Sequence, residues 1–131
     1  MSIEGLALTT ELLFEVLSNY AAPAQSIPAV SATPGWYVVG GFAMPINFTA
    51  RLSALASVSN GALTLRGRLY DVTTPGALDA VLFTQSLVDQ VVLSPEFDLK
   101  SGHSYQMQIE VTGGAGDAYF GILRNMQLVA P

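Results

Sequence analysis

The sequence predicts an all-β protein, an antiparallel two-sheet sandwich of about eight strands with an extended N-terminal arm. Apolar and polar residues alternate in short runs after residue 47, Gly, Pro, Asn and Ser punctuate these runs, and no helical crossover separates them. A chain of 131 residues is the usual size of one domain. We expect residues 1–34 to form the arm and a Pro/Ala/Ser-rich lead-in, and residues 35–131 to form the sandwich body.

The first third of the chain is less regular than the rest. Residues 9–20 (TTELLFEVLSNY) fit either a helix or a strand. We favour a strand or extended arm, because every later segment predicts β structure and a lone short helix would need its own packing surface. Residues 21–34 contain three prolines, which restrict them to an edge strand or an extended connection. Residues 36–39 (WYVV) predict a buried strand that ends at Gly40-Gly41.

The strongest local signal lies between residues 48 and 71. Two alternating runs, FTARLSALASVS and ALTLRGRLYD, flank Asn60-Gly61, the dipeptide typical of a two-residue type I′ hairpin. The predicted register pairs Val58 with Leu63. One face is then apolar and comprises Phe48, Ala50, Leu52, Ala54, Ala56, Val58, Leu63, Leu65, Gly67 and Leu69. The opposite face collects three of the five basic residues, Arg51, Arg66 and Arg68, and places Arg51 opposite Tyr70.

The rest of the chain predicts further strands at 81–85, 90–93, 97–99, 104–112, 118–123 and 126–129. Ser94-Pro95 ends the strand at 90–93, and Lys100 to His103 predict a tight turn. Residues 113–117 form a glycine-rich connection, which a strand follows, so a phosphate-binding loop is excluded. The Arg124-Asn125 step breaks the alternation and predicts a β-bulge.

Composition limits the classes of function. Charged residues make up 11% of the chain and apolar residues 50%, where soluble domains average about 25% charged. A surface so poor in charge is suited to being covered by copies of itself or by a partner. The net charge of −5 argues against a nucleic-acid partner. No run reaches the roughly 18 apolar residues of a membrane span.

The start of the chain, MSIEGLALTT, does not read as a secretory signal. We therefore expect a cytoplasmic or particle-associated protein, or a mature secreted chain. The chain has no cysteine, so disulfides and thiolate chemistry are excluded while either redox compartment stays open.

Residues that could carry catalysis or bind a metal are few. His103 is the only histidine, and we interpret it as a solvated turn residue, since no G-x-S-x-G elbow is present. Asp71, Asp98 and Asp117 lie near strand ends and are the candidates for a calcium site, although no D-x-D-x-D-G run is present. We expect no enzymatic activity and no cofactor. Paired carboxylates for glycoside hydrolysis depend on spatial separation, which the sequence does not reveal.

The predicted basic face is the one feature that points to a binding role. Arg51, Arg66 and Arg68 repel one another unless an anionic group meets them. Three interpretations stay open: a solvated sheet face with an Arg-Tyr stack, a subunit interface, or a site for a small anionic ligand such as an acidic sugar.

The stretches ALTLRGRLYDVTTPG and SPEFDLKSGHSYQMQIEVTG resemble jelly-roll modules, on two motifs. These are Leu69-Tyr70-Asp71 at a strand end and Leu99-Lys100-Ser101-Gly102-His103-Ser104-Tyr105, a Leu-x-x-Gly-x-x-Tyr turn into an amphipathic strand. Such modules include carbohydrate-binding modules, trimeric heads of the C1q and tumour-necrosis-factor type, and subunits of viral or phage particles. The resemblance implies the fold and a three-fold or ring-like assembly, and it carries over no site residue.

Two functions from different classes follow. The first is a non-enzymatic, self-assembling structural or surface-recognition subunit of a particle, fibre or adhesin, whose arm would pack on a neighbouring copy. The alternative is a carbohydrate-binding module, with or without calcium, whose sugar-stacking candidates are Trp36, Tyr37 and Tyr119.

Overall fold

The structure is a computed structural model that describes residues 21–22, 24–29, 35–114, 116 and 118–131. These residues form eleven β-strands and no helix. The strands are β1 (Ala21–Ala22), β2 (Gln25–Pro28), β3 (Tyr37–Ala43), β4 (Phe48–Val58), β5 (Thr64–Asp71), β6 (Gly76–Ala77), β7 (Leu82–Thr84), β8 (Gln90–Leu93), β9 (Phe97–Leu99), β10 (Ser104–Thr112) and β11 (Phe120–Val129).

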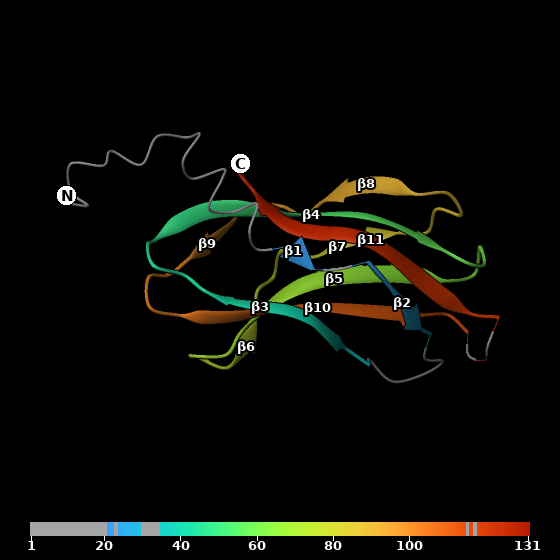
Figure 1. Cartoon of the computed structure of the whole chain (residues 1–131), viewed down its shortest axis with the longest axis horizontal. Coiled ribbons are helices and arrows are strands. Elements are labelled where there is room, and N and C mark those ends of the chain that lie inside the picture. The colour runs from blue at the N-terminus through green and yellow to red at the C-terminus, as the bar shows by residue number, and fades with distance from the viewer. Residues whose placement is uncertain (1–20, 23, 30–34, 115, 117) are drawn as a thin grey trace.

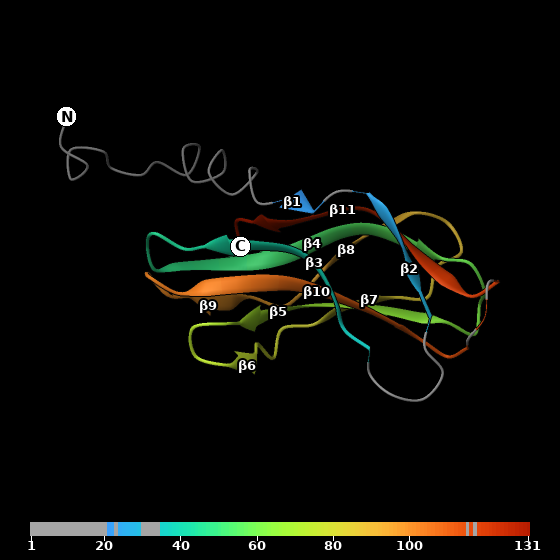
Figure 2. The ribbon, with the colours of Figure 1, turned by 60° about the horizontal axis from the view of Figure 1, so that its bottom comes forward.

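The strands pair in two antiparallel sheets that pack face to face. Sheet A has the order β1-β11-β4-β8, with β2 also paired to β11 and β9 also paired to β4. Sheet B has the order β3-β10-β5-β6, with β7 also paired to β5. Figure 1 shows the sandwich across its broad side, and Figure 2 shows β4 and β11 in one layer and β5 and β10 in the other.

The order of the strands identifies the fold. Three neighbouring strands each pair with two consecutive short strands: β11 with β1 and β2, β5 with β6 and β7, and β4 with β8 and β9. Counting each such couple as one position gives eight strand positions. Numbered along the chain, these positions run 1-8-3-6 in sheet A and 2-7-4-5 in sheet B. This interlocked arrangement is the jelly roll. The predicted all-β sandwich and its resemblance to jelly-roll modules are confirmed at the level of the fold.

The core lies between the sheets and follows the predicted alternation. In β10 the apolar residues Tyr105, Met107, Ile109 and Val111 are buried, as predicted. In β4 and β5 the residues of the predicted apolar face are buried, apart from the half-buried Phe48, and the polar residues Ser57 and Asp71 are buried as well. Burial of these side chains is the main favourable contribution to folding.

The predicted hairpin between β4 and β5 is wrong. β4 belongs to sheet A and β5 to sheet B, so residues 59–63 carry the chain from one sheet to the other. The Asn60 carbonyl accepts the Leu63 N–H (3.0 Å), and the Asn60 Oδ1 accepts the Ala62 N–H (2.9 Å). No residue other than glycine has a positive φ in the described ranges, whereas a type I′ turn at Asn60 requires one. The alternation fits both arrangements, because two strands that face each other across a core also point their apolar sides inward.

The predicted basic face is wrong for the same reason. Arg51 lies on β4 in sheet A, whereas Arg66, Arg68 and Tyr70 lie on β5 in sheet B. Because these side chains point outward from different sheets, Arg51 and Tyr70 are not cross-strand neighbours. Its cross-strand neighbour is Val129 of β11.

Most later elements are confirmed. β8, β9 and β10 have the predicted bounds, and β7 lies within the predicted 81–85. The turn at 100–103 is closed by the His103 N–H, which donates to the Lys100 carbonyl (3.2 Å). β11 runs through residues 124–125 with a register shift between Leu123 and Asn125, which is the predicted bulge.

The earlier elements differ more from the prediction. β3 continues beyond Gly40-Gly41 to Ala43 and is an edge strand, so Tyr37 and Val38 are exposed instead of buried. β1 and β2 pair with β11 at the edge of sheet A, so the edge-strand alternative for this part of the lead-in is confirmed. The prediction for residues 9–20 lies outside the described residues. In the described ranges, no helix is long and apolar enough to span a membrane.

Candidate functional site

Four large apolar side chains are exposed along one edge of the sandwich. Leu87 and Val88, in the connection from β7 to β8, are 62% and 73% exposed. Val91 and Leu93, on the edge strand β8, are 65% and 54% exposed. We call these four residues the apolar edge. Large apolar side chains exposed together on a folded protein commonly mark an interaction surface.

The backbone of β8 is also open at this edge. The Ser94 N–H donates to the Leu52 carbonyl (2.9 Å) on β4. Backbone groups alternate in direction along an antiparallel strand, so those of Val92 face β4 whereas those of Val91 and Leu93 face away from it. Among the described strands, β8 pairs with β4 alone. An unpaired edge of this kind is a template for a further strand.

The outer surface of sheet A adjoins the apolar edge, and the residues at its centre are uncharged. Leu55 lies between Val91 and Asn125 in the sheet, and Ser53 lies between Leu93 and Gln127. We call these six residues the sheet-A face.

The two arginines of sheet A are already paired and lie outside that centre. Arg51 contacts Glu96 (3.6 Å), and Arg124 contacts Asp89 (3.2 Å). A neutral centre with ion pairs around it is the usual distribution in a protein interface.

The outer surface of sheet B has a different chemistry. Four cross-strand pairs of β5 and β10 form what we call the polar ladder: Thr64 with Thr112, Arg66 with Glu110, Arg68 with Gln108, and Tyr70 with Gln106. Arg66 and Glu110 form an ion pair (3.6 Å), and the Arg68 Nε donates to the Gln108 Oε1 (2.9 Å). The ladder therefore brings together three of the four predicted ligand or interface residues, and Arg51 is excluded from it.

The three predicted sugar-stacking residues are in different settings. Trp36 precedes β3 and lies against the polar ladder, where the Arg68 guanidinium stands 3.9 Å from the centre of its ring. Tyr37 lies on β3 at the edge of sheet B. Tyr119 lies before β11 and packs against the core. Only Trp36 joins the predicted arginines.

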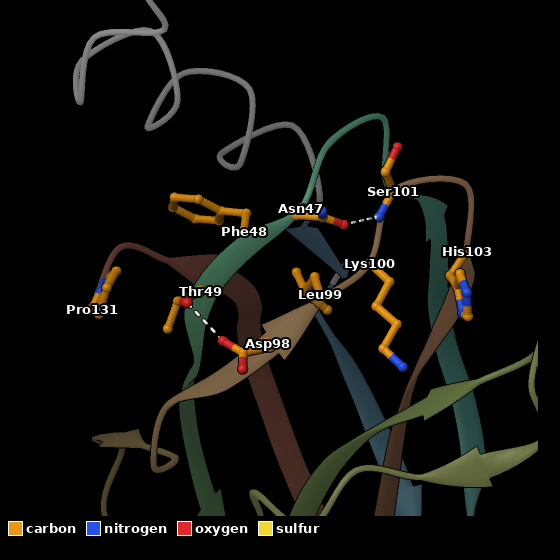
Figure 3. Close-up of a pocket in the computed structure, with 9 residues that line it drawn as sticks. All are labelled: Asn47, Phe48, Thr49, Asp98, Leu99, Lys100, Ser101, His103 and Pro131. Atoms are coloured by element: carbon orange, nitrogen blue, oxygen red, sulfur yellow. Dashed lines mark hydrogen bonds between the residues drawn. The ribbon is translucent and has the colours of Figure 1, made fainter.

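A depression of about 850 Å³ lies at one end of the sandwich (Figure 3). Its polar side chains are those of Asn47, Thr49, Asp98, Lys100, Ser101 and His103. The Ser101 hydroxyl donates to the Pro45 carbonyl (3.0 Å), and the Ser101 N–H donates to the Asn47 Oδ1 (2.8 Å). These bonds hold the turn at 100–103, and the first engages the Ser101 hydroxyl with a backbone carbonyl instead of with His103.

His103 is paired at the rim of this depression, and its predicted role as a solvated turn residue is wrong. Its Nδ1 lies 2.8 Å from the Asp71 Oδ2, and its side chain is 21% exposed. Burial alone would raise the pKa of Asp71, but hydrogen bonds from the Thr74 N–H and from His103 outweigh burial and hold this pKa below its ordinary value. The pair joins the turn after β5 to the turn before β10.

The calcium candidates do not meet in the described structure. Asp71 is engaged by His103 and Thr74, and Asp98 accepts a hydrogen bond from Thr49 (2.7 Å). Asp117 lies outside the described residues. In the parts of the chain that the structure describes, no three His, Asp or Glu side chains lie close enough together to hold a metal ion.

The apolar edge is not predicted by the sequence pattern. Residues 90–93 (QVVL) predict only a short strand, and the exposure of its side chains depends on β8 being the last described strand of sheet A. The two valines in succession are a usable signal, because a strand buried on one face rarely needs apolar residues on both.

No protein-family model matches the chain, and no curated protein matches it significantly. Among solved structures, the Eiger tumour necrosis factor of S. frugiperda aligns over 86% of this chain and 92% of its own, with 11% identity and a TM-score of 0.48. The globular domain of zebrafish complement 1qA aligns over 81% and 96%, with 19% identity and a TM-score of 0.38. A family two carbohydrate esterase from Cellvibrio japonicus aligns over 84% of this chain and 36% of its own, with 18% identity and a TM-score of 0.37. The jelly-roll assignment rests on the strand order itself.

Proposed function

We propose that this protein is a non-enzymatic, self-assembling structural or surface-recognition subunit, whose copies meet through the apolar edge and the sheet-A face. The apolar edge carries this proposal. Its four side chains are each more than half exposed, and two of them stand on a strand whose outward backbone groups face no other described strand.

Covering this surface is energetically favourable in two ways. Each large apolar side chain removed from water contributes up to about 1.5–3 kcal/mol before the entropy of association is subtracted. The N–H and C=O groups of Val91 and Leu93 can then pair with a strand of the neighbour. Proteins that stay monomeric usually protect such an edge with Lys, Pro or a bulge, and β8 (QVVL) has none of these.

A second copy of the chain is the partner that the charges favour. The one acidic residue next to β8, Asp89, is already bound by Arg124 (3.2 Å) and Ser57 (2.9 Å). Two copies that meet here therefore bring no unpaired like charges together. A partner that relied on charge would find only this engaged ion pair next to β8.

The non-enzymatic part of the proposal is supported by two hydrogen bonds of residues that line the depression. Nucleophilic catalysis needs a hydroxyl within reach of an activating base. His103 binds Asp71, and Ser101 binds Pro45, so these two residues do not form such a pair.

The test is the mass in solution, measured by light scattering on a size-exclusion column. We expect the wild type to be a multimer and Val91→Lys to shift it toward a single chain, because the ammonium would be buried without a partner. Val38→Lys is the matched control, since Val38 is exposed to a similar extent (56%) but lies on the edge strand of sheet B. A monomeric wild type would refute the proposal. A Val91→Lys variant that keeps the multimeric mass would remove the apolar edge from it.

A further inference from the structure

One guanidinium of the polar ladder is held rigidly in place. Arg68 stacks on Trp36, with its Cζ 3.9 Å from the ring centre, and its Nε donates to the Gln108 Oε1 (2.9 Å). Gln108 is itself fixed, because it is only 7% exposed and its Nε2 donates to the Gln106 Oε1 (3.2 Å). The side-chain entropy of Arg68 is thus largely lost before any ligand binds, which favours affinity.

The charge of Arg68 has no counterpart. Arg66 has Glu110 at 3.6 Å, whereas no carboxylate of the described residues lies within 4.0 Å of the Arg68 guanidinium. In the described part of the chain, its two terminal nitrogens make no hydrogen bond. The polar ladder therefore carries one uncompensated positive charge on a protein whose net charge is −5. The free side of a guanidinium matches the two oxygens of a carboxylate.

The neighbouring pair of the ladder contains an unsatisfied acceptor. Glu110 is 1% exposed, and its Oε2 is buried without a hydrogen-bond partner in the described structure. Arg66 reaches only the other oxygen, and half of its side chain is exposed. A buried carboxylate oxygen without a donor is unfavourable by about 1–3 kcal/mol or more. A ligand hydroxyl that reaches this oxygen beside the Arg66–Glu110 ion pair would supply the donor.

We propose that the polar ladder binds a small ligand with a carboxylate beside hydroxyl groups, of the uronic acid type. The carboxylate would pair with the terminal nitrogens of Arg68, and the hydroxyls would bind Gln106, Tyr70 and Glu110. This site lies on the opposite side of the sandwich from the sheet-A face, so it is independent of the proposed assembly.

Trp36 makes the proposal directly measurable, because it is the only tryptophan of the chain and it touches Arg68. We expect glucuronate to change the Trp36 fluorescence saturably. Glucose, which has hydroxyls alone, and acetate, which has a carboxylate alone, should each bind at least about tenfold more weakly. Glucose that binds as tightly as glucuronate would refute the role of the carboxylate, and acetate that does so would refute the role of the hydroxyls.

Variants identify the residue that binds the carboxylate. Arg68→Gln should weaken glucuronate binding at least about tenfold, and Arg68→Lys should give an intermediate loss because it keeps the charge without the planar fork. Arg124→Gln, on sheet A, is the control and should bind glucuronate like the wild type. Binding that is unchanged in Arg68→Gln, or no saturable change in the wild type, would overturn the proposal.

A second measurement avoids dependence on a variant that folds poorly. In wild-type protein labelled with ¹⁵N, the Arg68 Nε–H resonance should shift on addition of glucuronate, together with the Trp36 indole N–H. Shifts confined to other residues would place the ligand elsewhere and refute the site.

Discussion

At the scale of single residues, Asp71 links two turns that are distant in sequence. Its Oδ1 accepts the Thr74 N–H (3.0 Å) within its own turn, and its Oδ2 lies 2.8 Å from the His103 Nδ1. Hydrogen bonds to the ionised form lower a carboxylate pKa, whereas burial raises it. Because the pKa of Asp71 is lowered in the folded protein, its ionised form stabilises the fold.

Replacing Asp71 therefore has an effect that depends on pH. A lowered folded-state pKa gives stability that is present above the ordinary value of 3.8 and is lost as pH falls through the folded-state pKa. We expect Asp71→Asn to lose about 1–3 kcal/mol at neutral pH. The difference from the wild type should shrink as the pH falls below the ordinary value. Urea unfolding of both proteins over a pH series measures this.

Asp98→Asn is the control for this prediction, because Asp98 is exposed and its one hydrogen bond comes from Thr49. It should change stability by less than about 1 kcal/mol at every pH. A constant difference between Asp71→Asn and the wild type across the series would show that ionisation of Asp71 is not the cause.

Single residues also show what the sequence could and could not reveal about the polar ladder. Arg66, Arg68 and Tyr70 alternate on one strand, so their common face was predictable. The contact between Trp36 and Arg68 was not, because it crosses from the start of β3 over β10 to β5. Arg51 was misplaced because alternation alone does not tell which strands are neighbours.

At the scale of elements, β8 has two backbone edges with different roles. The groups of Val92 face β4, and those of Val91 face the open edge. Proline removes the N–H of the residue that it replaces, so it can distinguish the two edges.

We expect Val92→Pro to lower the free energy of unfolding by about 1–3 kcal/mol, because a ladder bond to β4 is lost. Val91→Pro should leave this free energy close to that of the wild type and should reduce the mass in solution. Urea unfolding measures the first effect, at a protein concentration low enough that assembly does not contribute. Light scattering measures the second effect.

Equal destabilisation by the two prolines would contradict the alternation that we infer for β8. Unchanged mass in Val91→Pro would show that copies do not meet through the backbone of this strand, even if the side chains of the apolar edge are covered.

Elements whose local pattern decides their form were predicted well. β10 alternates over nine residues, and the polar pair Arg124-Asn125 interrupts β11 at the observed bulge. The course of the chain at Asn60-Gly61 was not predictable from that dipeptide. A hairpin and a crossover between sheets both need a tight turn, and only the packing of the two sheets distinguishes them.

At the scale of the whole molecule, the jelly roll brings together segments far apart in sequence. β2 pairs with β11, and β4 pairs with β11 and β8. Folds dominated by such pairings form slowly, because long loops must close before the contacts that stabilise them exist.

We therefore expect refolding on a timescale on the order of milliseconds to seconds, followed by the fluorescence of Trp36 after dilution from urea. Circular dichroism at far-ultraviolet wavelengths should give the same rate if folding is two-state. Refolding within microseconds would contradict the inferred dependence on distant strand pairing.

The fold class was predictable from sequence because it depends only on the alternation of apolar and polar residues and on the turn residues between the strands. The apolar edge was not, since it exists only because β8 has no further strand beside it among the described residues. Which strand ends a sheet is a property of the complete arrangement, and the two successive valines are its one trace in the four residues of β8.

The separation of the two outer surfaces has a consequence for binding strength. Copies that meet through sheet A leave sheet B of each copy uncovered, so an assembly would present several polar ladders at once. A ligand with repeated acidic groups, such as a polymer, could then engage neighbouring copies together. Linked contacts of this kind raise the overall strength of binding by about 10²–10⁴-fold over a single contact. A site that holds one monosaccharide only weakly would thus become an avid receptor for a chain of them.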